Sequence, residues 1–322
     1  MKKVLVCGAG GFIGGHMVKR LKELGYWVRG VDIKKHLFLP VDETCDEFCL
    51  GDLRDSDFVK QVCKGIDYVY QFAADMGGAG FIFTGKNDAN IMYNSAMINL
   101  NVLDESLKNN VKRIFFSSSA CIYPEHNQMD SNNPNCEESS AYPAAPDSEY
   151  GWEKLFSERL YLAHKKNHNL DVRVARYHNI FGPYGVYDGG REKAPAAFCR
   201  KVSEAEDKTS IEVWGDGSQT RSFLFIDDCI DATYRLMNSD FVGPVNIGSE
   251  EIISIQNLAK KVIKISNKNI KIKNIEGPLG VMGRNSHNKL IKEKLGWEPS
   301  VSLDEGLKRT FAWIDKNRQE KK

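Results

Sequence analysis

The chain has 322 residues, 42% of them hydrophobic, with 44 Lys and Arg against 43 Asp and Glu and a formal charge of +1. That balance gives no basic surface for nucleic acid and no attraction to an anionic membrane. The length suits one large α/β domain and a smaller lobe. The eight cysteines form no Cys-x-x-Cys pair or zinc spacing, so we expect a cytoplasmic protein with reduced cysteines, no metal and no membrane span.

The first predicted element is a short buried strand over residues 3–7, which glycines and a helical pattern follow at once. Glycines at 8, 11 and 14 allow a tight turn, a close approach to a pyrophosphate and close packing of the helix on the sheet. We assign to cofactor binding the turn residues Gly8, Gly11, Phe12, Ile13 and Gly14.

A second predicted strand, residues 27–31, ends at Asp32. A carboxylate there would accept from the ribose hydroxyls and repel a 2′-phosphate. The strand, turn, helix and second strand together predict a dinucleotide site that prefers NAD to NADP.

Three more strands are predicted at residues 47–50, 68–72 and 111–116, and each ends in small or polar residues. The carboxyl ends of strands in a doubly wound parallel sheet form the ligand crevice. Asp52 and Leu53 are therefore expected beside adenine, and Ala73, Ala74 and Ser117 along the cofactor. An ordinary helix cap is the alternative role for Asp52.

Tyr150 and Lys154 lie four residues apart and so share one face of a predicted helix. An adjacent ammonium would lower the pKa of the tyrosine and hold the nicotinamide ribose. Ser119 would supply a second hydrogen bond to the reacting oxygen. Ser, Tyr and Lys are the side chains that a nicotinamide enzyme uses to move a hydride and a proton at a carbinol carbon. The nearby Cys121 suggests proton abstraction from carbon as well.

With these motifs in place, the chain resembles the extended short-chain dehydrogenases/reductases that act on sugar nucleotides, over nearly its whole length. Within that class it is most similar to the GDP-mannose 3,5-epimerases. The segments that carry the resemblance are 73–81 (AADMGGAGF), 118–124 (SSACIYP), 189–201 (GGREKAPAAFCRK) and 283–286 (GRNS). Ala79 departs from the bulkier Met expected there, which bears on the pocket volume and the identity of the sugar.

The resemblance implies an epimerase with tightly bound NAD that inverts C3 and C5 of GDP-mannose, to GDP-L-galactose and GDP-L-gulose. Ser119, Tyr150 and Lys154 would oxidise C4 transiently, and the ketone would acidify the protons on C3 and C5. Cys121 and Lys193 would be the acid/base pair on opposite faces of the ring. The implied substrate-binding residues are Gly78, Ser119, Asn179, Glu192, Lys193, Lys201, Gln219, Arg221 and Arg284.

We expect a Rossmann domain over residues 1–177, to which 222–248 returns, and a sugar-nucleotide lobe from 178–221 and 249–322. Asp227 is expected to cap a helix that runs toward Leu236. A homodimer is expected through two amphipathic helices, at 95–108 and from Tyr150 onward. The side chains expected to form that seam are Met97, Leu100, Leu107, Leu155 and Leu162.

Four other functions compete with this interpretation. A GDP-4-keto-6-deoxymannose epimerase-reductase also has a Ser-x-Cys strand end, but it pairs that Cys with His and consumes NADPH. Asp32 and Lys193 argue against this function. A 4,6-dehydratase would carry an acidic pair at Ala120 and Cys121. A 4-epimerase or related sugar-nucleotide enzyme and a non-catalytic NAD-binding protein are the remaining alternatives.

Overall fold

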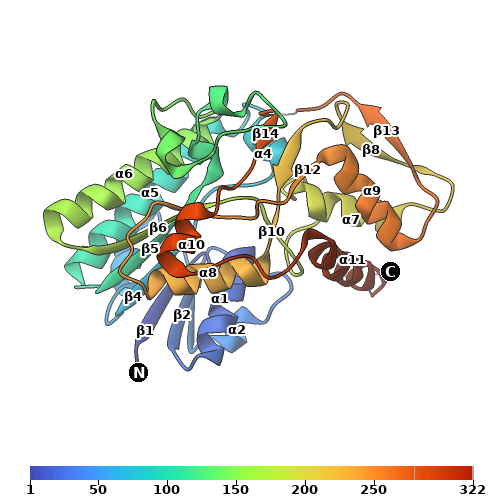
Figure 1. Ribbon diagram of the computed structural model, residues 1–322. Helices are drawn as coiled ribbons and strands as arrows, with labels where there is room; N and C mark the ends of the chain where they lie inside the picture. Colours follow the sequence, from blue (N-terminus) through green and yellow to red (C-terminus); the bar gives the residue numbers. More distant parts are fainter. Residues whose placement is uncertain (279, 321–322) are drawn as a thin grey trace.

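The computed structural model describes residues 1–278 and 280–320, so Leu279, Lys321 and Lys322, which our lobe assignment includes, lie outside the described residues. Its centre is a seven-stranded sheet in the order β11-β6-β5-β4-β1-β2-β3, in which every neighbouring pair is parallel (Figure 1). The strands are β1 (Lys3–Cys7), β2 (Trp27–Asp32), β3 (Glu47–Leu50), β4 (Tyr68–Gln71), β5 (Arg113–Ser119), β6 (Asp171–Tyr177) and β11 (Val245–Ile247). The predicted doubly wound parallel sheet is confirmed.

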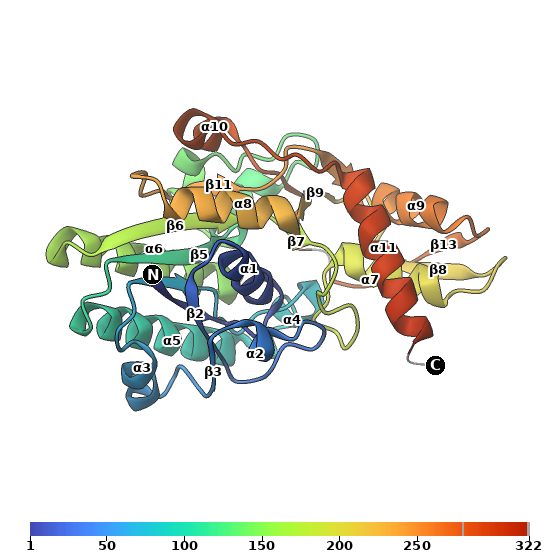
Figure 2. The same cartoon turned by 90° about the horizontal axis from the view of Figure 1, so that it is seen from below.

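Alternating side chains of the strands explain why helices cover both faces of this sheet. Val4 and Val6 of β1 point into one core with Met17 and Leu21, whereas Leu5 and Cys7 point into the other. Helices α1 (Phe12–Glu23) and α8 (Ile226–Met237) cover the first face, and α3 (Ser56–Val62), α5 (Asp88–Lys108) and α6 (Glu149–His168) cover the second (Figure 2). Short helices α2 (Val41–Thr44) and α4 (Ala79–Ile82) lie in connecting loops.

A smaller lobe lies beyond the carboxyl ends of the strands (Figure 1). Its helices α7 (Ala194–Glu204), α9 (Ile255–Ser266) and α11 (Leu303–Gln319) pack on one another. Its strands are β8 (Ser210–Trp214) paired with β13 (Lys271–Ile275), and β9 (Thr220–Ser222) between β12 (Ile252–Ser254) and β14 (Gly283–Arg284). Helix α10 (Lys289–Leu295) contacts β11 of the large sheet. The domain boundaries that we assigned stay a prediction.

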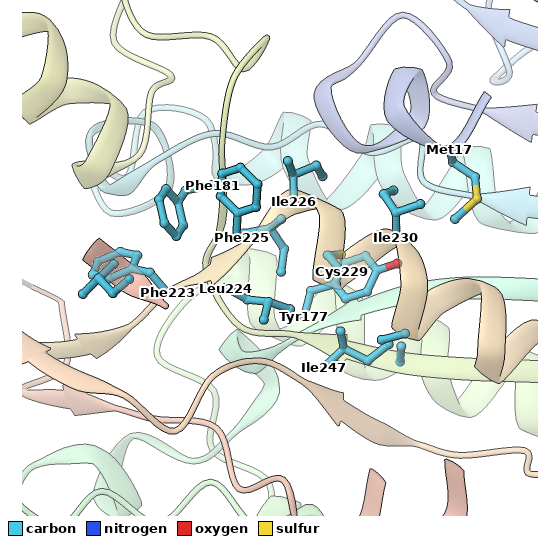
Figure 3. Packing of buried hydrophobic residues seen from close by; sticks show 14 of the residues in the cluster. Met17, Tyr177, Phe181, Phe223, Leu224, Phe225, Ile226, Cys229, Ile230 and Ile247 are labelled. Atoms are coloured by element: carbon cyan, nitrogen blue, oxygen red, sulfur yellow. The ribbon is translucent and has the colours of Figure 1, made fainter. Parts of the chain in front are cut away.

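One continuous apolar cluster joins the lobe to the sheet. Strands β7 (Ile180–Phe181) and β10 (Leu224–Phe225) pair in parallel, and the Phe181 ring meets Phe223 and Phe225 edge-on at centroid distances of 6.3 and 5.8 Å. Figure 3 shows Ile230 of α8 near Met17, in the same cluster. This packing fixes the lobe relative to the crevice.

The cap predicted for α8 is wrong in position. The N-cap residue is Phe225, and Asp227 lies in the first turn, where a carboxylate still complements the helix dipole. Within residues 1–278 and 280–320, none of the helices is long and apolar enough to cross a bilayer.

Candidate active site

The turn after β1 brings backbone unusually close to backbone. Gly8 has φ of +83°, and a Cβ there would lie 2.9 Å from the amide nitrogen of Ala73. A Cβ at Gly14 would lie 2.0 Å from the carbonyl oxygen of Gly8, so glycine lets α1 begin directly against the turn. The first turn of α1 has no acidic residue and no side-chain cap, which leaves its N–H groups for an anionic ligand.

Asp32, at the end of β2, is held against this turn. Its Oδ2 accepts from the Gly10 N–H at 3.0 Å, and its Oδ1 accepts from the Lys34 N–H at 3.2 Å. Burial raises the pKa of Asp32, and these two N–H donors oppose that shift. Of these two donors, Gly10 belongs to the glycine turn, and it was not among the predicted cofactor residues.

A cavity of about 530 Å³ runs from this turn toward α6. Fifteen of the predicted site residues line it: Gly8, Gly11, Phe12, Ile13, Gly14, Asp32, Asp52, Leu53, Ala73, Ala74, Ser117, Ser119, Tyr150, Lys154 and Lys193. Asp52 sits at its edge, paired with Arg54 at 2.5 Å, and the residue that caps α3 is Asp55. The cavity thus joins the predicted cofactor residues to the predicted reacting residues.

Ser119, Tyr150 and Lys154 meet because β5 ends against the start of α6. A Cβ at Gly151 would lie 2.2 Å from the Cys121 carbonyl oxygen, so the glycine after Tyr150 allows that approach. Ser119 Oγ accepts from the Cys121 N–H at 3.2 Å and is hydrogen-bonded to Tyr150. Lys154 is buried and donates to the Ser117 carbonyl oxygen at 3.0 Å.

The electrostatics of this group differ from our expectation. Burial raises the pKa of Tyr150, as does Cys121, while the hydrogen bond with Ser119 lowers it. In the protein alone the net shift in the pKa of Tyr150 is therefore upward, and the predicted net lowering is wrong. The ammonium lies 5.8 Å from the centroid of the Tyr150 ring, and its own pKa is lowered by burial.

A second group of charged side chains surrounds Cys121. The guanidinium of Arg284 donates from Nη1 to the Cys121 sulfur at 3.0 Å, from Nη2 to Asp147 Oδ2 at 3.0 Å, and from Nε to Gln128 Oε1 at 2.5 Å. Lys193 ends the loop before α7. Burial lowers the pKa of Lys193 and the nearby Cys121 raises it, so the thiol interacts electrostatically with Lys193 as well as with Arg284.

Eight predicted residues lie outside the lining of the cavity: Cys121, Gly78, Asn179, Glu192, Lys201, Gln219, Arg221 and Arg284. All but Cys121 and Gly78 belong to the segments 178–221 and 249–322, which we assigned to the smaller lobe. Asn179 donates to the Ser222 carbonyl oxygen at 3.1 Å, and Lys201 donates to the Glu212 carbonyl oxygen at 2.9 Å. Gln219 Oε1 is buried and has no hydrogen-bond partner among the described residues, so it is available to a ligand.

Backbone contacts bring Gly78 and Glu192 together. The Gly78 N–H donates to the Arg191 carbonyl oxygen at 3.0 Å, and a Cβ at Gly78 would lie 2.2 Å from the Glu192 carbonyl oxygen. Glu192 itself accepts from the Gly190 N–H at 2.7 Å. Arg221 donates to the Thr220 and Val281 carbonyl oxygens, and burial with the charge of Arg284 lowers its pKa to about 10.

Sequence reasoning missed a polar chain along the rim of the cavity. Arg54 donates to Asn94 at 2.7 Å, Asn94 donates to Asp75 at 3.0 Å, and Arg191 donates to Asp75 at 3.3 Å. The Arg191 guanidinium also lies 3.9 Å from the centroid of the Phe81 ring. Asp75 follows a strand end, which was the available signal, whereas nothing in the local sequence marks Asn94 or Asp147.

Comparison with known proteins agrees with this geometry. Residues 4–248 match the model of the NAD dependent epimerase/dehydratase family. The chain is 48% identical to the GDP-mannose 3,5-epimerase of Arabidopsis thaliana over 320 residues, which cover 99% of this chain and 84% of that protein.

Two solved structures share the fold over nearly the whole chain. The UDP-glucose 4-epimerase of Thermotoga maritima with UDP-glucose has a TM-score of 0.85 at 26% identity and covers 98% of this chain and 99% of that one. A mutant UDP-glucuronic acid 4-epimerase from Bacillus cereus, in complex with UDP-4-deoxy-4-fluoro-glucuronic acid and NAD, has a TM-score of 0.82 at 26% identity, with the same coverage.

Proposed function

The chain belongs to the NAD dependent epimerase/dehydratase family, and we propose that it is an NAD-dependent GDP-mannose 3,5-epimerase. The observation that carries the proposal is that two groups are neighbours: Ser119, Tyr150, Lys154 and Lys193 line the cavity, and Cys121 lies directly beside Ser119. Ser119, Tyr150 and Lys154 suit oxidation of a carbinol, and Cys121 with Lys193 suits proton exchange at carbon. The 48% identity to a GDP-mannose 3,5-epimerase supports GDP-mannose as the substrate.

The residues at the amino end of the cavity fit a dinucleotide. The backbone turn at Gly8 to Gly14 leaves room for a pyrophosphate where side chains would collide, and the start of α1 would bind it. Asp32 would hold the adenosine ribose, because its carboxylate is already oriented by the Gly10 N–H. When bound, NAD would supply the hydride acceptor for the oxidation of C4 and the hydride donor for its reduction.

The protein's part in the C4 step is to move one proton. Tyr150 accepts the proton of the C4 hydroxyl, and Ser119 donates a hydrogen bond to the same oxygen. Because burial raises the pKa of Tyr150, its phenolate depends on nearby positive charge, and Lys154 supplies an ammonium beside the ring. The same Tyr150 returns the proton when C4 is reduced.

The C4 ketone makes the protons on C3 and C5 acidic, and the second group then acts. One of Cys121 and Lys193 removes a proton from carbon and leaves an enolate, and the other donates a proton to the opposite face, so that the centre inverts. The hydrogen bond from Arg284 to the Cys121 sulfur stabilises the anion that a base requires. Burial lowers the pKa of Lys193, which makes its neutral amine more available.

We also propose a homodimer, formed by two copies of this chain through α5 and α6, which lie side by side. Both helices carry large exposed apolar side chains: Tyr93 and Leu100 on α5, and Trp152 and Phe156 on α6. Leu155, which we had placed in the seam, is instead buried within the chain against Ile122 and Tyr123.

The free state of the cysteines supports our placement of the protein in the cytoplasm.

The test is incubation of the purified protein with GDP-mannose in deuterium oxide, followed by separation of the sugar nucleotides and mass analysis. We expect GDP-L-galactose and GDP-L-gulose, deuterium at the inverted carbons, and no steady build-up of NADH. Products inverted at C4 alone, or unchanged GDP-mannose with no deuterium, would exclude the proposal.

The homodimer has its own test. Light scattering at micromolar concentration should give the mass of a dimer, and a monomer mass would exclude the proposed homodimer.

A further inference from the structure

The guanidinium of Arg284 is fixed on two sides by buried side chains before it reaches the thiol. Arg284 is 5% exposed and Gln128 is fully buried, and the Asp147 side chain is 4% exposed. Arginine presents its donors in a rigid planar fork. Because Gln128 binds Nε and Asp147 binds Nη2, the plane is determined and Nη1 points to the Cys121 sulfur.

The orientation of Gln128 follows from its donor and acceptor groups. Its Nε2 donates to the carbonyl oxygens of Tyr123 and Pro124, at 2.9 and 3.1 Å. The amide oxygen is therefore the atom that faces Arg284. Gln128 in this way ties the guanidinium to the backbone that directly follows the turn of Cys121.

Asp147 ties the guanidinium to the start of α6. It precedes Ser148, the N-cap of that helix, whose Oγ donates to Asp147 Oδ1 at 3.3 Å and accepts from the Gly151 N–H at 3.3 Å. Arg284 itself comes from β14 in the other lobe. The donor to the thiol thus comes from one lobe, while the residues that aim it belong to the loops around β5 and α6.

The charges agree with this arrangement. Burial lowers the pKa of Arg284, but the nearby Cys121 and Asp147 outweigh burial and the net shift is upward. Arg221, whose pKa burial and Arg284 lower, adds a second positive charge to the cluster. Asp147 is the carboxylate in direct contact with the Arg284 guanidinium, so it also balances that buried charge.

We propose that Asp147 and Gln128 are positioning residues that hold Arg284 against the Cys121 sulfur, and that they control proton exchange at C3 and C5 without controlling oxidation at C4. The inference rests on the proposed function of Cys121. Proton exchange and C4 oxidation should respond differently, because Arg284 donates a hydrogen bond directly to the thiol, whereas Arg284 affects Tyr150 only through its charge.

The test compares Asp147→Ala with Asp147→Asn in the full-length holoprotein at saturating GDP-mannose in deuterium oxide. Asp147→Ala should slow deuterium incorporation by about 10- to 100-fold, the usual effect of a misplaced group. The absorbance of reduced cofactor that forms on mixing should match the parent. Asp147→Asn keeps an oxygen acceptor for Nη2 and should recover most of the exchange, which a general loss of packing would not do.

Two further variants guard the interpretation. Gln128→Met removes the acceptor for Nε without removing a charge, and it should show a smaller loss of exchange with unchanged cofactor reduction. This variant replaces Asp147→Ala in the test if Asp147→Ala does not fold. Asp130→Ala is the matched control, since Asp130 is exposed on the same loop as Gln128 and its carboxylate accepts from the Asn132 N–H. It should behave as the parent.

The outcomes separate this inference from the proposed function. Normal exchange in Asp147→Ala and Gln128→Met would overturn the positioning role and leave the epimerase intact. An equal loss of exchange and of cofactor reduction would also overturn it, because the effect would then be structural. Absence of exchange in the parent would overturn the proposed function, and the inference with it.

Discussion

The two halves of the proposed active site are built in different ways. Ser119, Tyr150 and Lys154 lie on one strand end and one helix of the same domain, and a backbone approach at Gly151 brings them together. Cys121, Lys193 and Arg284 come from a turn, a loop of the other lobe and a two-residue strand, and Arg284 is 163 residues from the thiol that it contacts. The first half is local in sequence, and the second exists only in the folded chain.

This difference decides what a substitution can reveal. Changes in the hydride half should stop everything, since without the ketone no proton on carbon is acidic. Changes in the half around Cys121 should stop proton exchange alone. The two halves are therefore separable by experiment even though they share one substrate.

The largest effect is expected from Tyr150→Phe. It removes the hydroxyl that accepts the C4 proton, so reduction of bound cofactor by GDP-mannose should slow by about 10³-fold, within the usual scale for a positioned acid or base. Deuterium exchange at C3 and C5 should fall equally. Stopped-flow absorbance and mass analysis would measure the two, and exchange that continues without cofactor reduction would break the proposed order of steps.

Cys121→Ser should separate the halves. A serine hydroxyl is nearly isosteric with the thiol but far too weakly acidic to replace it, so exchange should fall by about 10²-fold. Reduction of bound cofactor should persist, because Ser119 and Tyr150 are untouched. Normal deuterium exchange in this variant would show that the thiol is structural and that a group other than Cys121 removes the proton from carbon.

The same contrast describes how much the sequence predicts. The bounds of β1, β2 and β3 agree with prediction to within one residue, because apolar runs that end in glycine or acidic residues are strong local signals. The cavity lining includes every residue predicted for the cofactor. These are properties of short segments.

What sequence reasoning missed depends on contacts between distant segments. Leu155 has the spacing of an outward-facing residue, yet the loop after β5 covers it. The sequence suggested a role for Arg284 at the diphosphate, and that role stays a prediction, but its contacts with Cys121, Gln128 and Asp147 could not be inferred from spacing. The pKa of Tyr150 likewise depends on burial, which no motif specifies.

Asp32→Ala tests whether the cofactor end acts on both halves equally. The Gly10 and Lys34 N–H groups would lose their acceptor and the ribose its partner, so affinity for NAD should fall by about 10-fold or more, the scale of hydrogen bonds to a charged group. Discrimination against NADP should relax as well. Excess NAD should restore oxidation and exchange together, and titration of both cofactors would show whether another residue recognises the ribose.

The smallest effect concerns stability, and it compares one lysine from each half. Burial lowers the pKa of both Lys154 and Lys193, so each is costly to keep charged in the folded protein. Lys154 is compensated by the Ser117 carbonyl oxygen and by the carboxylates of Glu153 and Glu158. Lys193 has thiols for its compensating neighbours, and Arg284 opposes its charge.

Lys193→Met should therefore raise the Tm by about 2 °C at pH 7, although it removes one of the two groups proposed for proton exchange. Lys154→Met should give a smaller gain in Tm, or a loss.

The gain in Tm depends on pH because the charge of the lysine does. A lysine whose folded pKa is depressed costs stability in full below that folded pKa, and the cost disappears as pH rises to the unfolded value of about 10.4. The advantage of Lys193→Met should thus shrink between pH 7 and pH 10. Thermal unfolding at both values would measure it, and a lower Tm or a gain that does not change with pH would mean that the lysine is solvated and its charge costs nothing.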